Sequence, residues 1–114
     1  MSHKGSCHCG NITFEAEGDF DSVKECNCSH CSRKGYLLWF MPRSNLSMTV
    51  EDDSLSTYTF NKHSIQHHFC SHCGCAPFGF GEHGGMAMAA VNVRCLEDVD
   101  LSTIKREFVD GRSL

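Results

Sequence analysis

Nine cysteines in a chain of 114 residues constrain this fold more than any other feature of the sequence. Thiolate sulfur is a soft ligand, typical of sites for zinc, copper(I) or iron–sulfur clusters. The cysteines therefore indicate metal binding first, and a disulfide framework is the alternative. Seven of them fall into three short groups: Cys7 and Cys9; Cys26, Cys28 and Cys31; Cys70 and Cys73.

The start of the chain decides how these thiols are interpreted. Residues 1–6 contain no apolar segment of the kind that marks a secretory signal. We therefore expect the chain to reside in the reducing cytoplasm, where thiols stay free and bind metal. A disulfide framework would also leave one of the nine cysteines unpaired. Zinc is the expected metal.

The length and net charge of the chain limit its number of domains and its classes of partner. A chain of 114 residues predicts a single zinc-binding domain, residues 1–114, small enough for metal cross-links to matter. No segment approaches the roughly 20 apolar residues of a membrane span, so we expect no membrane partner. The formal net charge is −4 and the ten lysines and arginines are scattered, which disfavours nucleic acid.

The first and last cysteine pairs predict one closed site. Cys7 and Cys9 lie two residues apart, so their side chains point to the same side of an extended backbone. Cys70 and Cys73, with the glycine that follows, form a C-x-x-C-G knuckle whose backbone N–H groups face the sulfurs. Four thiolates match the ligand set of a structural zinc. This zinc would fasten the strand expected over 12–16 to the middle of the chain.

The middle group, formed by Cys26, Cys28 and Cys31, has three members. Three protein ligands are typical of a catalytic zinc, which keeps a fourth position open for water or substrate. The alternative is a second closed site, completed by Cys75, Cys95 or a nearby histidine. We prefer the open site because the triplet has no obvious fourth cysteine beside it.

A short helical turn is expected at this triplet. Ser29 can cap a turn over 30–34, and Gly35 can end it. Backbone N–H groups at the start of such a turn stabilise nearby thiolates. His30 lies between two cysteines of the group, so we expect its ring to point away from the metal, although it could still accept a proton from a bound thiol.

The remaining segments indicate β structure. Alternating or β-prone residues predict strands over 12–16, 46–50 and 55–60. The continuous apolar run 36–41 suits a strand buried on both faces, or one wall of a pocket. The small apolar segment 86–94 is expected to form a central strand.

Substrate-binding residues are not assigned by the sequence. Most histidines outside the cysteine motifs are expected to be ordinary strand or turn residues, namely His63, His67 and His68. Three aromatic residues are pocket candidates by their chemistry alone: Trp39, Phe78 and Phe80.

The cysteine motifs and their surroundings resemble one known family. The segments are GSCHCGNITF at 5–14, CNCSHC at 26–31, HFCSHCG at 68–74 and VNVRCL at 91–96, with Asp110-Gly111 near the end. In this order they resemble the glutathione-dependent formaldehyde-activating enzyme family, which also includes centromere protein V. The resemblance spans nearly the whole chain, and its three-part cysteine pattern is specific.

The resemblance implies a mainly β fold of coiled antiparallel sheets around a structural zinc, similar to that of methionine sulfoxide reductase B. It also implies two zinc ions per chain, in agreement with the partition that the spacing favours. The implied ligands are Cys7, Cys9, Cys70 and Cys73 for the structural zinc, and Cys26, Cys28 and Cys31 for the catalytic zinc.

The implied reaction is that of a carbon–sulfur lyase similar to S-(hydroxymethyl)glutathione synthase. Such an enzyme joins or splits a thiol, here glutathione, and formaldehyde through a zinc-bound thiolate. The rival hypothesis is a non-enzymatic zinc-binding scaffold that binds a protein partner. A closed second metal site would favour the scaffold, and an open one favours the enzyme.

Overall fold

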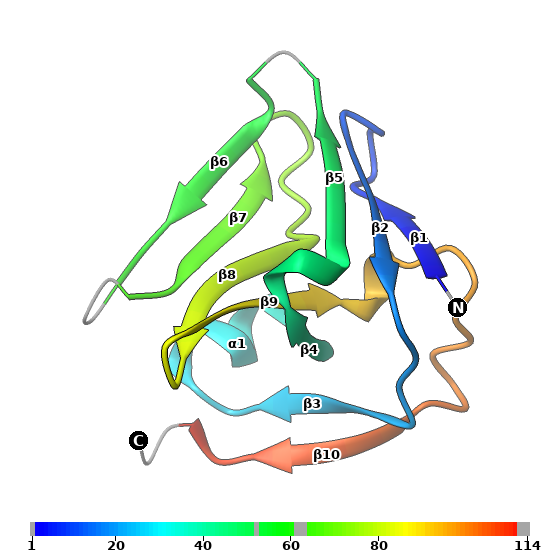
Figure 1. The fold of residues 1–114 in the computed structure, drawn as a ribbon, viewed down its shortest axis with the longest axis vertical. Helices are drawn as coiled ribbons and strands as arrows, with labels where there is room; N and C mark the ends of the chain where they lie inside the picture. The colour runs from blue at the N-terminus through cyan, green and yellow to red at the C-terminus, as the bar shows by residue number, and fades with distance from the viewer. Residues whose placement is uncertain (1, 52, 61–63, 112–114) are drawn as a thin grey trace.

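A computed structural model describes residues 2–51, 53–60 and 64–111 of the chain. The described residues form ten β-strands, one short α-helix and two 3-10 turns, which confirms the mainly β prediction (Figure 1). The helix α1 spans Ser29–Lys34, and the turns η1 and η2 span Arg43–Asn45 and Val93–Cys95. The strands are β1 (Ser2–Ser6), β2 (Ile12–Glu17), β3 (Ser22–Cys26), β4 (Leu38–Pro42), β5 (Leu46–Val50), β6 (Leu55–Tyr58), β7 (Gln66–Cys70), β8 (Phe78–His83), β9 (Met86–Asn92) and β10 (Lys105–Val109).

The strands form two sheets. A three-stranded sheet has the order β1-β2-β5, and a seven-stranded sheet has the order β10-β3-β4-β9-β8-β7-β6. Neighbouring strands are antiparallel throughout, except that β10 is parallel to β3. The predicted strands 12–16, 46–50 and 55–60 correspond to β2, β5 and β6. The predicted central strand is β9, the fourth of seven in its sheet.

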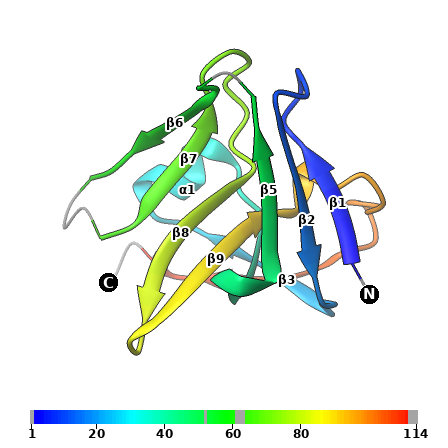
Figure 2. The same cartoon turned by 45° about the horizontal axis from the view of Figure 1, so that its top comes forward.

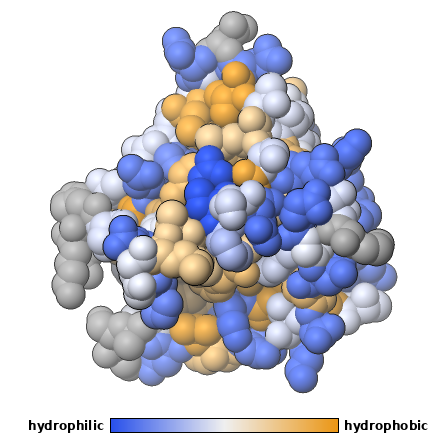
Figure 3. All heavy atoms as spheres, in the orientation of Figure 1, coloured by the Kyte–Doolittle hydropathy of each residue, from blue (hydrophilic) through white to orange (hydrophobic). Residues whose placement is uncertain are grey.

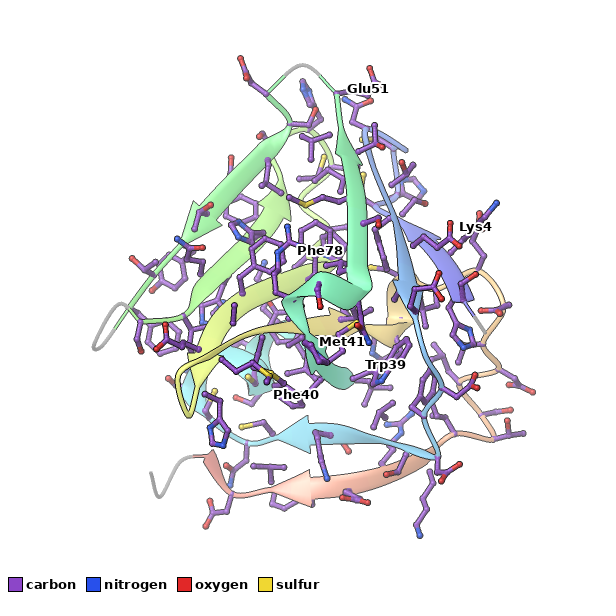
Figure 4. The ribbon with its side chains drawn as sticks, viewed as in Figure 1. Lys4, Trp39, Phe40, Met41, Glu51 and Phe78 are labelled. Atoms are coloured by element: carbon purple, nitrogen blue, oxygen red, sulfur yellow. The ribbon has the colours of Figure 1, made fainter. Side chains whose placement is uncertain are left out.

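The hydrophobic core includes residues of both sheets. Phe14 on β2 meets Phe78 on β8 edge to face, with ring centroids 5.6 Å apart. Trp39 and Met41 on β4 are buried, whereas Phe40 between them is 50% exposed. Figure 4 shows these three side chains along β4. The prediction of a strand buried on both faces is therefore wrong, because successive side chains point to opposite faces and only one face of β4 is covered.

The helix α1 lies behind the seven-stranded sheet in both ribbon views (Figures 1 and 2). On the near face, hydrophobic residues are interspersed with hydrophilic ones (Figure 3). In the parts of the chain that the structure describes, no helix is both long and apolar enough to cross a membrane.

Candidate metal centres

The first and last cysteine groups meet at one point of the fold. The sulfur atoms of Cys7, Cys9, Cys70 and Cys73 lie within 4.8 Å of one another. Cys7 and Cys9 belong to the connection between β1 and β2, and Cys70 ends β7, so the group joins the two sheets. The Cys9 sulfur lies 3.7 Å from the Cys7 sulfur and 3.6 Å from the Cys70 sulfur. Tetrahedral zinc with bonds of about 2.3 Å spaces its sulfurs about 3.8 Å apart, so the group fits zinc.

Two tight turns shape this four-sulfur group. Gly10 and Gly74 adopt φ angles of 86° and 81°, in the left-handed region that favours glycine. Each donates its N–H to the carbonyl oxygen of the first cysteine of its pair, Cys7 or Cys70. The N–H of Ile12 points at the Cys7 sulfur, 3.4 Å away. The turn expected of the C-x-x-C-G motif is thus present.

The electrostatics of the group favour thiolates at Cys73 and Cys70. At Cys9 the N–H of Asn11 lowers the pKa, but burial and the neighbouring sulfurs of Cys70 and Cys7 outweigh it and raise the pKa to about 12. Burial raises the pKa of the Cys73 thiol, but hydrogen bonds, first those from the N–H groups of Cys75 and Cys9, outweigh burial and lower the pKa to about 5. Burial likewise opposes ionisation of Cys70, and N–H groups of Cys73 and His72 lower its pKa overall. Thiolates are the form that binds metal. The donor set and its charge therefore both suit zinc.

Cys75 and Cys95 lie beside the four-sulfur group without joining it. The group of four mutually close sulfurs includes neither of them. Burial raises the pKa of Cys95 to about 12, and the charges of Cys75 and Cys7 add to the rise, which places Cys95 near that group. Neither cysteine joins the three-sulfur group, so the alternative in which one of them completes that site is not realised in this structure.

The middle cysteines form a separate three-sulfur group. Cys26 ends β3, Cys28 precedes α1, and Cys31 lies within α1. Their sulfur atoms lie within 4.8 Å of one another, and no fourth sulfur, imidazole or carboxylate from the described residues joins them. The Cys28 thiol accepts a hydrogen bond from the Cys31 N–H, at 3.2 Å, and so caps the helix. The expectation that Ser29 is the cap is wrong, whereas Gly35 ends the helix in the left-handed conformation as predicted.

The three sulfurs influence one another strongly. Burial favours the neutral Cys28 thiol, but N–H groups of Cys31 and His30 donate to its sulfur and lower its pKa overall. Burial raises the pKa of the Cys31 thiol, and the neighbouring sulfurs of Cys28 and Cys26 raise it further. A second negative charge beside the first is unfavourable, and this repulsion adds to the effect of burial. A divalent cation removes that penalty, so these residues also fit zinc.

The C-terminal strand supports the three-sulfur group from the side. Val109 on β10 pairs with Cys26 on β3 and accepts a hydrogen bond from the Asn27 N–H, at 3.1 Å. The Asn27 side chain donates to the Asp110 carboxylate at 2.9 Å. Gly111 comes so close that a Cβ atom there would lie 2.4 Å from the Cys26 sulfur. The last described residues therefore hold the loop that carries the cysteines.

His30 does not join the three sulfurs; its ring packs among other rings. Its centroid lies 4.2 Å from that of His67 and between 5.3 and 5.6 Å from those of Tyr36, Tyr58 and Phe60. The His30 Nδ1 is buried and has no hydrogen-bond partner among the described residues. We call these five residues the ring cluster. The ring cluster connects the segment that carries Cys26, Cys28 and Cys31 with strands β6 and β7.

A cavity of about 500 Å³ opens beside the ring cluster. Its walls include four members of the cluster and two cations from α1: His30, Tyr36, Tyr58, His67, Arg33 and Lys34. His67 lies on a strand as expected, but its position in the cavity wall was not predicted. Burial, reinforced by the neighbouring His30, lowers the pKa of His67 to about 4, so its imidazole is neutral at pH 7.

The pocket candidates named from chemistry lie elsewhere. Trp39 and Phe78 belong to the core, and neither they nor Phe80 line this cavity. His68 is a packed strand residue, as expected, with its Nδ1 2.9 Å from the hydroxyl of Thr57. The third histidine of that prediction, His63, lies outside the described residues.

Comparisons with known proteins cover most of the chain. A family model described as glutathione-dependent formaldehyde-activating enzyme matches residues 2–109. Among solved structures, a crystal structure of a Rhodobacter sphaeroides protein is similar, with a TM-score of 0.79 and 28% sequence identity. That match covers 91% of this chain and 99% of the other. The family-model match includes both cysteine groups.

Proposed function

This chain belongs to the glutathione-dependent formaldehyde-activating enzyme family, and we propose that it joins a thiol to formaldehyde at its three-sulfur group. The observation that carries the proposal is the group itself. Three sulfurs lie together with no fourth donor from the described residues, which is the ligand count of a catalytic zinc. A cavity that could hold the rest of a substrate opens next to the same loop.

We assign a structural zinc to the four-sulfur group of Cys7, Cys9, Cys70 and Cys73. A metal bound there would hold the β1–β2 connection against the end of β7, and so link the two sheets. Because a domain of this size buries a limited core, such a link contributes directly to folding.

The catalytic zinc is assigned to Cys26, Cys28 and Cys31. When bound, the ion would supply a Lewis acid that lowers the pKa of a substrate thiol. The chain contributes the N–H groups of Cys31 and His30, which donate to the Cys28 sulfur and lower its pKa against the opposing effect of burial. It also contributes the brace from Asn27 to Asp110, which keeps the loop in place.

The proposed reaction is an addition without redox change. The substrate thiol gives up its proton, and the sulfur attacks the carbonyl carbon of formaldehyde. A C–S bond forms, the C=O double bond becomes a single bond, and the oxygen takes up a proton to give the S-hydroxymethyl product. In the reverse direction the hydroxyl group gives up its proton, the C=O double bond re-forms as the C–S bond breaks, and the sulfur takes up a proton, which is the lyase reaction. A reducing compartment keeps thiols free to bind metal, so the proposal places the chain in the cytoplasm.

The test is NMR exchange spectroscopy on the two-zinc protein with glutathione and formaldehyde. The protein should accelerate interconversion of free glutathione and its hydroxymethyl adduct over the uncatalysed rate. Cys31→Ser should abolish the acceleration and leave the fold intact. Unchanged exchange in the presence of two bound zinc ions refutes glutathione as the substrate, and an unfolded Cys31→Ser chain indicates a structural site, as in a zinc scaffold that binds a protein partner.

A further inference from the structure

The cavity beside the ring cluster is too large for formaldehyde alone. At about 500 Å³ it falls within the range of roughly 300–1,000 Å³ that is usual for pockets that enclose a whole small ligand. Formaldehyde has two heavy atoms and needs no such space. If the chain joins formaldehyde to a thiol, as proposed above, the cavity matches the larger partner.

The position of the cavity connects it to the three-sulfur group. His30 donates its backbone N–H to the Cys28 sulfur and places its ring in the cavity wall. Tyr36 also lines the cavity, with its ring centroid 5.6 Å from that of His30. A ligand in the cavity would therefore lie against His30, which belongs to the loop that carries the cysteines, and against its neighbour Tyr36.

The charge of the cavity is one-sided. Arg33 and Lys34 on α1 line it, and none of the described lining residues is acidic. The guanidinium of Arg33 donates through Nη1 to the Ser29 carbonyl, at 2.8 Å, which fixes the side chain and leaves its other N–H groups for a ligand. The Lys34 ammonium lies over the ring of Phe69, 5.3 Å from the centroid. Two cations without a carboxylate between them favour an anionic ligand.

The opposite wall is aromatic. Tyr58 on β6 is paired in register with His67 on β7, so both rings face the same side of the sheet. Tyr58 remains 49% exposed although its ring stacks on those of His30 and Phe60. An exposed aromatic face packs well against planar groups such as amides.

We propose that this cavity binds the thiol substrate, with a carboxylate of the substrate at Arg33 and Lys34 and a planar amide part against Tyr58. That the ligand is a thiol rests on the proposed function. Where the ligand binds, and through which residues, is a separate claim. It selects peptide-like thiols that carry a carboxylate over small uncharged thiols.

Binding can be measured without the reaction by using a thioether. S-methylglutathione keeps both carboxylates and both amides but has no free thiol, so it cannot form the S-hydroxymethyl adduct. We expect it to bind the two-zinc protein, and to shift the NMR signals of α1 and of the β6–β7 pair. Its diethyl ester lacks the carboxylates and should bind at least about tenfold more weakly, as expected for the loss of hydrogen bonds to charged groups.

Variants test the assigned residues. Arg33→Gln and Lys34→Gln should each weaken binding of S-methylglutathione about tenfold or more, and Arg33→Lys should weaken it less than Arg33→Gln. Tyr58→Ala should weaken it as well. The matched control is Arg106→Gln, which removes a partly exposed cation from β10, where it lies 3.7 Å from Glu25. That change should alter binding less than twofold.

Each outcome bears on one claim. If S-methylglutathione does not bind, or if Arg33→Gln affects binding no more than Arg106→Gln does, the cavity assignment is wrong even when the protein catalyses adduct exchange. If binding follows the predicted order but the protein does not accelerate exchange, the cavity assignment stands and the proposed reaction fails. NMR spectra of each variant show whether the fold is retained, and the ester comparison tests charge recognition on unaltered protein.

Discussion

Replacing Gly111 with alanine tests how the C-terminal segment supports the three-sulfur group. The added Cβ would lie 2.4 Å from the Cys26 sulfur and 3.3 Å from the Cys28 Cβ. Ordinary contacts of this kind lie near 3.5–4 Å, so one of the two groups must move by about 1 Å. Cys26 moves more easily than the backbone of Gly111, because its sulfur lies at the end of a short rotatable side chain.

The size of the effect follows from the demands of metal binding. Zinc–ligand distances tolerate changes of about 0.2 Å, so a sulfur displaced by about 1 Å no longer binds in place. We expect the zinc affinity of the three-sulfur group to fall by roughly 100-fold, at the upper end of the losses caused by changes around metal ligands. Crowding itself should cost about 1–3 kcal/mol of folding stability.

The assay is competition for zinc against a chromophoric chelator, which resolves a strong and a weak site. Gly111→Ala should weaken only the weak site. The matched control is Gly81→Ala on β8, where the added Cβ would meet the Ile65 side chain at an ordinary 3.7 Å. If Gly111→Ala keeps both sites at wild-type affinity, Gly111 does not constrain Cys26 and the description of this support is wrong.

Three further predictions concern metal and pH. A chelator should remove one zinc ion while the NMR spectrum stays folded, and removal of the second should unfold the chain; loss of both in a single unfolding step contradicts two distinct sites. Cys73→Ser should lower Tm strongly, whereas Cys31→Ser should lower it little; equal effects in thermal unfolding argue against separate structural and catalytic roles. Burial, then the neighbouring His30, lowers the pKa of His67 to about 4, below its unfolded value of 6.5, so the unfolded chain binds the extra proton between these values. Stability should therefore fall as pH drops from about 6.5 to about 4. His67→Gln should reduce that fall, measured by urea unfolding at each pH, by a modest amount because the residue is only partly buried. Identical pH profiles for the two proteins refute the assignment.

The four-sulfur group could be predicted because its chemistry is local. The C-x-C and C-x-x-C-G motifs each define a tight turn with a glycine, and both glycines adopt the expected left-handed conformation. Two such turns need only one another to make a complete ligand set. The helix cap was harder, since a thiol at Cys28 takes a role that usually belongs to serine or threonine.

The contact of the C-terminal segment with Cys26 and the cavity beside the ring cluster could not be predicted, because both depend on contacts between segments that are distant in the sequence. Gly111 reaches Cys26 through the parallel pair β10 and β3, whose sequences KREFV and SVKEC lack a clear apolar alternation. The cavity depends on α1 lying against β6 and β7, where Tyr58 faces the same side as His67. Neither contact leaves a pattern within one segment. The closeness of Arg33 to an aromatic wall follows from tertiary packing alone.

The most direct test of the central claim is zinc K-edge X-ray absorption of the two-zinc protein, before and after addition of glutathione. A closed four-sulfur site and an open three-sulfur site together predict seven sulfur ligands and one lighter ligand for two zinc ions. Addition of glutathione should replace the lighter ligand by an eighth sulfur. Eight sulfur ligands before addition, or an unchanged spectrum after it, would contradict an open site that binds the substrate thiol.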